Sequence, residues 1–332
     1  MLSELEFEDF KAQEFDSVLD VRSPREFKEA HLSGALNFYA LSDEEHQEIG
    51  TLYKKSPSLA KTKGAAFICA NVARRLEDLT QRVRIGAKIG VYCARGGLRS
   101  RAVGVILSEL GYRVVRLRGG FKAYRAFVNA YFAAPLGLKF FVLCGNTGCG
   151  KTELLSLLSR AIDLEAMAGH LGSSFGDILG EQPSQKAFEE ALFFRLQALK
   201  EWAFIESESP KIGRISLPKR LYEAMQGGVK ILCVASLQER IARIKRLYKD
   251  RMDATRFRLC LGRISPYISR NLRLDLQKSY EQGEWERLIA MLLSYYDGSY
   301  KKPARVDKVL NTDDIGRARE ELLEFCILKS FH

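Results

Sequence analysis

The chain has 332 residues, of which 46% are hydrophobic and 28% charged, as in a globular protein large enough for two domains. No apolar run reaches the ~18–20 residues of a transmembrane helix, and the acidic N-terminus lacks the basic residues of a signal peptide. We therefore expect a cytoplasmic protein without a membrane partner. The seven cysteines form no Cys-x-x-Cys pair and only four histidines are present, so neither a disulfide framework nor a zinc site is expected.

The first part of the chain alternates short strands with helices. We predict a strand at 17–22, a helical turn at 25–30, mostly helix over 41–84, a strand at 88–92, a helix at 101–110 and a strand at 112–117. Alternation of this length predicts a parallel α/β sheet. We assign residues 1–132 to this domain.

A linker at 133–137 precedes a second α/β unit. An apolar strand at 140–144 opens it, and apolar runs at 202–205 and 230–235 predict further buried strands. From residue 237 onwards the pattern is predominantly helical. We therefore expect a second domain at 138–332 that ends in a basic helical region.

Cys93 lies between the strand at 88–92 and the next helix, in a loop with two glycines. The amides of such a loop and the positive end of the helix can bind one anion together. Arg95 and Arg99 would favour the nucleophilic thiolate of Cys93. The alternative, a buried structural cysteine, gives the glycines and arginines no role. We therefore predict that Cys93, Arg95 and Arg99 are catalytic.

Three segments in order resemble the rhodanese domain family: Asp-Val-Arg-Ser-Pro-Arg-Glu-Phe from residue 20, the Cys93 loop, and Arg-Leu-Arg-Gly-Gly-Phe from residue 116. The resemblance covers roughly residues 10–128 and implies a rhodanese-like domain. Five residues separate Cys93 from Arg99, which is the spacing of rhodanese-related phosphatases and one residue longer than in sulfurtransferase rhodaneses. We expect this wider loop to hold a tetrahedral phosphate-like group rather than a single sulfur.

The run at 145–152 matches the P-loop pattern, follows a predicted strand and precedes a helix, which indicates a P-loop NTPase-like fold for the second domain. Its amides and Lys151 can hold a diphosphate, and Thr152 can hold Mg²⁺, a candidate cofactor. The predicted diphosphate-binding residues are Gly145, Asn146, Thr147, Gly148, Cys149, Gly150, Lys151 and Thr152.

Glu206 and Glu208 follow the predicted strand at 202–205 and lie on one face of an extended segment. We predict that these acids bind Mg²⁺ or a water molecule near the P-loop phosphates. The alternative is a pair of solvated surface acids at the end of a strand.

Residues 240–273 contain eleven Lys or Arg and two acids, which supplies +9 of the net charge of +11. Basic residues interleaved with aromatic ones are typical of RNA binding, through phosphate contacts and base stacking. The predicted RNA-binding residues are Arg240, Arg243, Lys245, Arg246, Lys249 and Arg251. Two alternatives stay open: a lid over the P-loop phosphates, and the solvated face of an amphipathic helix.

The sequence around the P-loop resembles the tRNA 2-selenouridine synthase family, in blocks at 170–176, 182–185 and 206–213 and at Tyr296 to Tyr300. This family often has Glu-Asp-Glu-Ser where the chain has Glu206-Ser-Glu208-Ser, so one acid is missing. The resemblance covers nearly the whole chain and implies a substrate pocket at His170, Gly172, Ser173, Ser174, Gln182 and Gln185.

The resemblance implies a two-step change of 2-thiouridine at the wobble position of tRNA, to S-geranyl-2-thiouridine and then to 2-selenouridine. Geranyl diphosphate and selenophosphate are then substrates, and no tightly bound cofactor is expected. The anticodon loop of tRNA is the expected partner, and a selenophosphate-producing enzyme is a further candidate. Geranyl requires an apolar pocket. Its candidate lining is Phe175, Phe188, Phe193 and Phe194, with plain core packing as the alternative.

Two other functions stay open. One is an ATP-dependent kinase or NTPase with a regulatory rhodanese domain, and the other is a non-catalytic sulfur-sensing module with a degenerate P-loop. The intact Cys93 loop and the Lys151-Thr152 pair argue against the sensing module. The block at 172–185 argues against a generic kinase, for which it has no known use.

Overall fold

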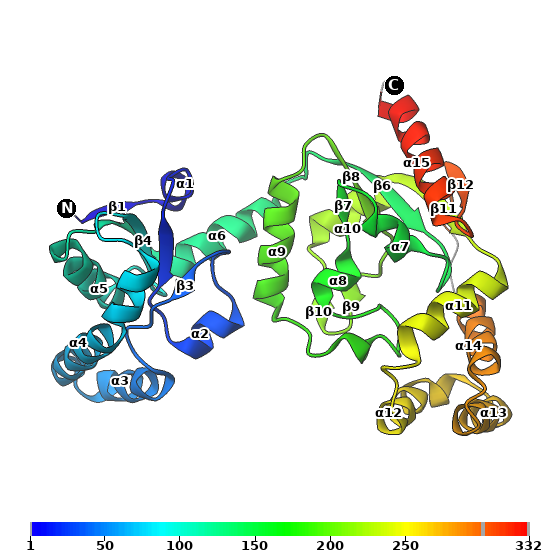
Figure 1. Cartoon of the computed structure of the whole chain (residues 1–332), viewed down its shortest axis with the longest axis horizontal. Coiled ribbons are helices and arrows are strands. Elements are labelled where there is room, and N and C mark those ends of the chain that lie inside the picture. The colour runs from blue at the N-terminus through cyan, green and yellow to red at the C-terminus, as the bar shows by residue number, and fades with distance from the viewer. Residues whose placement is uncertain (1, 300–302, 331–332) are drawn as a thin grey trace. The chain divides into compact units, whose positions relative to one another are not determined.

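The computed structural model describes residues 2–299 and 303–330, so Tyr300 lies outside the described residues. The chain divides into two compact units, Met1–Ala133 with Glu189–Ala191, and Ala134–Phe188 with Leu192–His332 (Figure 1). No helix in the described ranges is both long and apolar enough to cross a membrane.

The first unit is built on a five-stranded sheet with the order β1-β5-β4-β2-β3, in which every neighbouring pair is parallel. The strands are β1 Ser3–Leu5, β2 Ser17–Asp20, β3 Leu36–Asn37, β4 Lys88–Tyr92 and β5 Arg113–Leu117. The sequence of β4 is apolar because the central strand of a parallel sheet is covered on both faces. The parallel α/β sheet predicted for this part of the chain is confirmed.

Helices connect these strands. They are α1 Phe7–Lys11, α2 Pro24–Glu29, α3 Asp43–Lys55, α4 Pro57–Arg82, α5 Leu98–Glu109 and α6 Gly120–Ala133. The helical region predicted at 41–84 is interrupted at Ser56, since Pro57 cannot donate the N–H bond that would continue α3. The core beneath α4 and α5 contains Ile68, Val72 and Leu107.

The second unit is built on a five-stranded parallel sheet with the order β12-β11-β6-β8-β7. The strands are β6 Lys139–Cys144, β7 Ala161–Ile162, β8 Trp202–Glu206, β11 Val229–Val234 and β12 Lys308–Asn311. β6 is central and pairs with β8 and β11. The predicted P-loop NTPase-like α/β fold is confirmed.

Several elements of this unit lie beside the sheet: α7 Lys151–Ser156, α8 Leu164–Ala168, the 3-10 helix η1 Asp177–Leu179, α9 Gln185–Gln197, the antiparallel hairpin β9 Lys211–Ile212 and β10 Ile215–Ser216, α10 Lys219–Gly227, and α15 Ile315–Ser330. A helical segment stands between β11 and β12: α11 Leu237–Tyr248, α12 Ala254–Ile264, the 3-10 helix η2 Ser265–Tyr267, α13 Arg270–Glu281 and α14 Trp285–Ser299 (yellow to orange in Figure 1).

The helical segment has its own apolar cluster, which includes Phe257, Leu261 and Leu276 together with Phe175 from the segment before η1. The predominantly helical pattern predicted from residue 237 is therefore correct, except for β12. The sequence signal of β12 is weak because only Leu310 is buried, whereas Val309 is 54% exposed. Its pairing with β11 shows that β12 completes the sheet as an edge strand.

Candidate functional site

The loop after β4 places Cys93 at the carboxyl end of the central strand of its sheet. Cys93 is 3% exposed, and its Sγ lies 3.3 Å from Oγ of Ser100 in the first turn of α5. Gly96 adopts a positive φ of 66°, which a side chain would strain. The loop therefore has the strand–loop–helix geometry predicted for an anion site, and Ser100 is a neighbour of the thiol that the sequence did not single out.

The segment after β5 supports this loop from one side. Phe121 and Lys122 donate backbone N–H bonds of 2.8 and 3.0 Å to the carbonyls of Cys93 and Ala94. A Cβ on Gly120 would lie 2.1 Å from the carbonyl oxygen of Cys93. This close approach explains the glycine pair of the segment that begins at Arg116.

Arg99, which ends the Cys93 loop, forms an ion pair with Glu26 of α2, with a distance of 2.6 Å between Nη1 and Oε2. Burial alone would raise the pKa of Glu26, but the hydrogen bond and charge of Arg99 bring it below its usual value. Glu26 also accepts the N–H of Ser23, in a capping box at the start of α2. Arg95 is exposed. Glu26 therefore holds Arg99 in place. The sequence did not indicate a role for Glu26 in the site.

Asp20 and Arg22 have a structural role. Both are buried, their side chains pair at 2.6 Å, and the Arg22 guanidinium lies 3.7 Å above the ring of Phe121. This pair connects the end of β2 with α6, so the first rhodanese-like motif fixes the sheet beside the loop.

The P-loop joins β6 to α7, and its glycines at 145, 148 and 150 all have positive φ values. Nζ of Lys151 donates a 2.8 Å hydrogen bond to the carbonyl of Gly145. Burial alone would lower the pKa of Lys151, but the neighbouring Cys149 thiol and the carboxyl groups at 165, 206 and 208 raise it. Lys151 is therefore positively charged.

Three carboxyl groups gather beside the P-loop, on Glu165, Glu206 and Glu208, with one oxygen of each within 4.8 Å of the others. Glu206 is fully buried; its Oε1 accepts the N–H of Glu165 at 2.8 Å, and its Oε2 has no hydrogen-bond partner among the described residues. Glu165 follows β7 and also bonds to Thr152. The sequence predicted Glu206 and Glu208 but missed Glu165, whose only signal is its place after a two-residue edge strand.

The three carboxyl groups repel each other in a buried environment. Burial, and secondarily the charge of Glu208, raise the pKa of Glu165 to about 8. Burial also raises the pKa of Glu206 and that of Glu208. Glu206 thus has a buried oxygen that lacks a partner among the described residues, within a cluster of oxygen atoms of the type that Mg²⁺ prefers. These residues fit a divalent cation beside Thr152.

The predicted pocket residues divide into two groups. Gly172 allows the carboxylates to approach, since a Cβ there would lie 2.8 Å from Oε1 of Glu165. Ser173 bonds to the hydroxyl of Tyr248, and the carbonyl of Ser174 accepts a 3.0 Å hydrogen bond from Arg263. These three residues lie at the P-loop side of the helical segment.

The other pocket residues support the backbone of the unit. His170 is buried and accepts the N–H of Gly172 on Nδ1 at 3.1 Å; burial lowers the pKa of this ring. Gln182 donates to the carbonyls of Ala168 and Ile212. Gln185 exchanges two hydrogen bonds with the backbone of Ser216. The two glutamines thus attach the segment before α9 to the hairpin β9–β10.

The basic residues of α11 face in two directions. Arg240 and Arg243 are each 8% exposed and point inward. Arg240 donates to the carbonyl of Thr147 at 2.9 Å and pairs with Asp297 at 2.6 Å. Arg243 pairs with Glu153 of α7 at 2.8 Å. These two arginines contact the P-loop backbone and neighbouring carboxylates, and they do not form an exposed basic surface.

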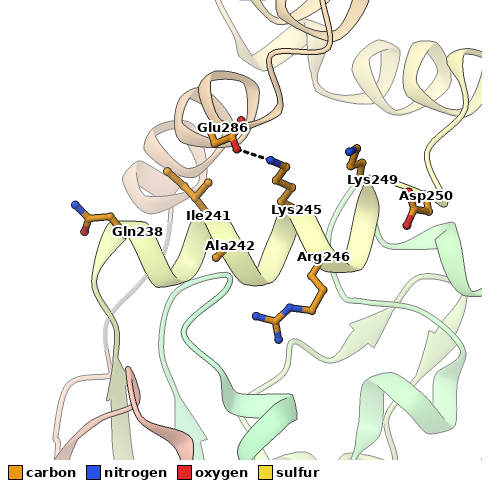
Figure 2. Close-up of a pocket in the computed structure, with 8 residues that line it drawn as sticks. All are labelled: Gln238, Ile241, Ala242, Lys245, Arg246, Lys249, Asp250 and Glu286. Atoms are coloured by element: carbon orange, nitrogen blue, oxygen red, sulfur yellow. Dashed lines mark hydrogen bonds and ion pairs between the residues drawn. The ribbon is translucent and has the colours of Figure 1, made fainter.

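The other face of α11 borders an open groove of about 720 Å³ (Figure 2). Lys245 extends over it and pairs with Glu286 of α14, whereas Arg246 is 71% exposed and lies 3.6 Å from Glu153. Lys249 and Arg251 are also exposed. Of the six predicted RNA-binding residues, four are therefore available to a polyanion: Lys245, Arg246, Lys249 and Arg251.

The phenylalanines that were predicted to line an apolar pocket also fall into two groups. Phe175 lines a small cavity beside the P-loop, together with Tyr248 and Tyr296. Phe188 and Phe193 are fully buried in α9 and do not line that cavity. Core packing, the alternative for these residues, fits the two of them.

Together the fold and the two loops define a protein in which a rhodanese domain precedes a P-loop domain. A family model for rhodanese-like domains matches residues 4–127, and one for the AAA domain of tRNA 2-selenouridine synthase matches residues 138–263. The tRNA 2-selenouridine synthase of Hydrogenovibrio crunogenus is 30% identical, over 90% of this chain and 93% of that protein. That of Shewanella woodyi is 31% identical, over 86% and 87%. The chain belongs to the tRNA 2-selenouridine synthase family.

Replacing Glu165 by Gln should stabilise the protein at alkaline pH in the absence of divalent cations. Unfolded Glu loses its proton near pH ~4.3, whereas folded Glu165 keeps it up to about pH 8. The folded state binds more protons in this window, so the stability of the wild type falls as the pH rises through it. Thermal unfolding at pH 5 and pH 8.5 should show a gain only at pH 8.5, where ~1 kcal/mol corresponds to about 2–4 °C.

The matched control for Glu165→Gln is Glu320→Gln, because Glu320 is an exposed glutamate of α15. It should leave the melting temperature unchanged at both pH values. A loss of stability in Glu165→Gln at pH 8.5 would contradict the like-charge repulsion within the cluster.

Replacing Arg240 by Met should destabilise the protein, because Asp297 loses its ion pair and the Thr147 carbonyl loses its donor. Hydrogen bonds to charged groups contribute about 1.5–3 kcal/mol. Arg246→Met on the same helix should change the free energy of unfolding by less than ~0.5 kcal/mol. Urea unfolding of both variants tests this, and equal values would show that the two faces of α11 are not distinct.

Proposed function

We propose that this protein replaces the sulfur of 2-thiouridine in tRNA by selenium, in two steps at two sites. In the first step the sulfur attacks C1 of geranyl diphosphate: a C–S bond forms, the C–O bond breaks, diphosphate leaves, and the N3 proton is released. In the second step selenium from selenophosphate attacks C2 of the base, and geranylthiol leaves as N3 regains a proton. Water takes the phosphoryl group, which is released as phosphate.

One observation carries the proposal: the chain has two separate anion-binding loops, and each of the two steps uses a phosphorus-containing substrate. The P-loop amides and Lys151 suit the diphosphate that leaves in the first step. The loop of Cys93, with its longer spacing, suits the tetrahedral group of selenophosphate. The relatives from Hydrogenovibrio crunogenus and Shewanella woodyi are tRNA 2-selenouridine synthases, which supports the overall conversion.

The residues of the P-loop unit support the departure of diphosphate. Lys151 supplies a positive charge. The amides at 148 and 150 belong to glycines with positive φ values, which a residue with a side chain would rarely adopt. Thr152, Glu165, Glu206 and Glu208 would hold Mg²⁺, which would neutralise developing charge on the leaving group. Arg240 and Arg243 keep the loop in place from α11.

In the Cys93 unit, Ser100 lies within hydrogen-bond distance of the thiol, and Glu26 orients Arg99. We propose that the Cys93 thiolate attacks the phosphorus of selenophosphate while Arg99 and the loop amides bind the phosphate oxygens. An S–P bond forms, the P–Se bond breaks, and the selenide that leaves attacks C2 of the base; water then hydrolyses the S–P bond and releases phosphate. For tRNA, the exposed face of α11 and the residues Lys249 and Arg251 that follow it support phosphate contacts near the anticodon loop.

An ATP-dependent kinase or NTPase is the second candidate function. The observation that favours it is the position of Arg240 and Arg243 against the P-loop, as a lid over nucleotide phosphates would require. One experiment separates the two: incubate the protein with 2-thiouridine tRNA, geranyl diphosphate and selenophosphate without ATP. Geranylated and selenated nucleosides in mass spectrometry support the first function, and a strict need for ATP supports the second.

The two loops should be separable by mutation. Lys151→Ala should lower geranylation by on the order of 10²–10³-fold, because a charged donor to the leaving group is lost. Cys93→Ser should block selenation of S-geranyl-tRNA supplied directly and leave geranylation intact. Single-turnover assays followed by nucleoside mass spectrometry measure both steps.

Cys69→Ser is the control for the cysteine variant, because Cys69 is an exposed cysteine of the same unit. It should leave both steps unchanged. Loss of geranylation in a well-folded Cys93→Ser protein would contradict the assignment of one step to each loop.

Charge reversal at Arg246 and Lys249 should weaken tRNA binding and flatten its dependence on salt, by ~0.7–0.9 in the log–log slope for each phosphate that the variant no longer neutralises. Arg317→Glu, an exposed position of α15, is the control. Filter binding at several salt concentrations measures the slopes. Unchanged slopes in the double variant would favour the solvated-face alternative for this side of α11.

A further inference from the structure

A small cavity lies inside the helical segment, beside the P-loop. It has a volume of about 50 Å³ and is bounded by α11, α12 and α14 and by the segment at 173–175. Its lining includes Ile244, Phe257, Trp285 and Leu288. The two-site reaction proposed above gives this cavity no role so far.

The cavity begins at the P-loop. Thr147 of the loop is part of its lining, and a Cβ on the adjacent Gly148 would lie 3.0 Å from Cδ1 of Ile244. Ile244 itself lines the cavity. A ligand whose diphosphate occupies the P-loop would therefore have its remaining part close to this cavity.

The walls of the cavity carry no charge. The polar side-chain groups of its lining are the indole N–H of Trp285 and a few hydroxyls, and the hydroxyls of Ser173 and Tyr248 bond to each other. Burial raises the pKa of Tyr248, and it raises the pKa of Tyr296 to about 12, so both phenols are neutral. A hydrocarbon gains free energy on entering such a space, whereas a nucleobase would leave most of its polar edge without partners.

Aromatic rings close the side of the cavity formed by α12 and α14. Phe257 stacks on Tyr280 with 4.0 Å between ring centroids, and Tyr280 meets Trp285 edge-on at 5.8 Å. This wall is rigid because each ring is supported by the next. Met252 is the adaptable part of the lining, since its side chain is unbranched and flexible.

We propose that this cavity binds the hydrocarbon chain of the diphosphate donor and that its aromatic wall limits the length of that chain. The inference rests on the proposed function, because it names the chain-binding part of the same P-loop site. The present volume is below the ~300 Å³ of common ligand pockets, so side chains such as Met252 move as the chain enters. The aromatic wall limits how far the cavity can expand, which favours a short isoprenoid over a long one.

The first test measures binding without any transfer step, with the full-length protein. Geranyl diphosphate should bind at least ~100-fold more tightly than inorganic diphosphate in calorimetry, since each buried methylene contributes about a factor of four. Equal affinity of the two ligands would overturn the inference, even if the protein transferred geranyl to tRNA.

The second test changes the size of the cavity at Leu288, which is 2% exposed. Dimethylallyl, geranyl and farnesyl diphosphate serve as donors for alkylation of 2-thiouridine tRNA, and kcat/KM is measured for each. Leu288→Ala should raise the farnesyl-to-geranyl ratio by about tenfold or more, and Leu288→Phe should lower the geranyl-to-dimethylallyl ratio by a similar factor. Ratios are informative because a loss of stability affects all donors alike.

The matched control is Leu276→Ala. Leu276 is 1% exposed and belongs to the same apolar cluster, but it does not line the cavity. It should lower stability about as much as Leu288→Ala and leave the donor ratios unchanged. If the wild type transfers geranyl and the Leu288 variants keep the wild-type ratios, the cavity assignment is wrong and the proposed function stands. If the wild type transfers no prenyl group, the proposed function fails, and the binding test alone decides the cavity.

Discussion

Parallel pairing of the strands brings the chemistry of each unit to one edge of its sheet, since parallel strands all end on the same side. In the first unit Cys93 follows β4, and Asp20 ends the neighbouring β2. In the second, the P-loop follows β6, Glu206 ends β8, and Glu165 comes after β7, with Leu143 opposite Glu206 and Ile162 opposite Ile205 in the two pairings. Residues separated by dozens of positions in the sequence become neighbours because of this single constraint.

The P-loop side of this edge is electrostatically unfavourable without ligands. Three carboxyl groups share a buried space, and Lys151, the fixed cation of the P-loop, is turned back onto a loop carbonyl. Glu206 keeps an oxygen without a partner among the described residues. Functional sites often retain such costs, because the same groups that repel each other in the free protein bind a cation or a charged leaving group well. The glycines at 148, 150 and 172 permit this crowding, since a side chain at any of them would meet a neighbour.

The helix α11 contributes side chains to two functions. Arg240 and Arg243 point to the P-loop and hold its carbonyls, whereas Arg246 and Lys249 border the open groove. Arg243 and Arg246 share Glu153 of α7 as an ion-pair partner. Because a rigid helix carries both sets, the basic run that the sequence shows as one block serves two purposes. The cavity between α11, α12 and α14 adds a third surface to the same segment, on the side of Ile244.

The sequence by itself determined the following features: the strand–loop–helix order around Cys93 and at 145–152, the two parallel α/β sheets, and the acids at 206 and 208. These depend on nearby residues, such as a buried strand followed by glycines and a helix start, and are therefore readable from the chain. Only the tertiary structure decided that Glu165 joins Glu206, that Glu26 holds Arg99, that Arg240 and Arg243 turn inward, and that Phe175 lines a cavity while Phe188 and Phe193 fill the core. Those outcomes depend on which distant elements pack together, and neither hydrophobic period nor charge count specifies the direction in which one side chain of a helix points.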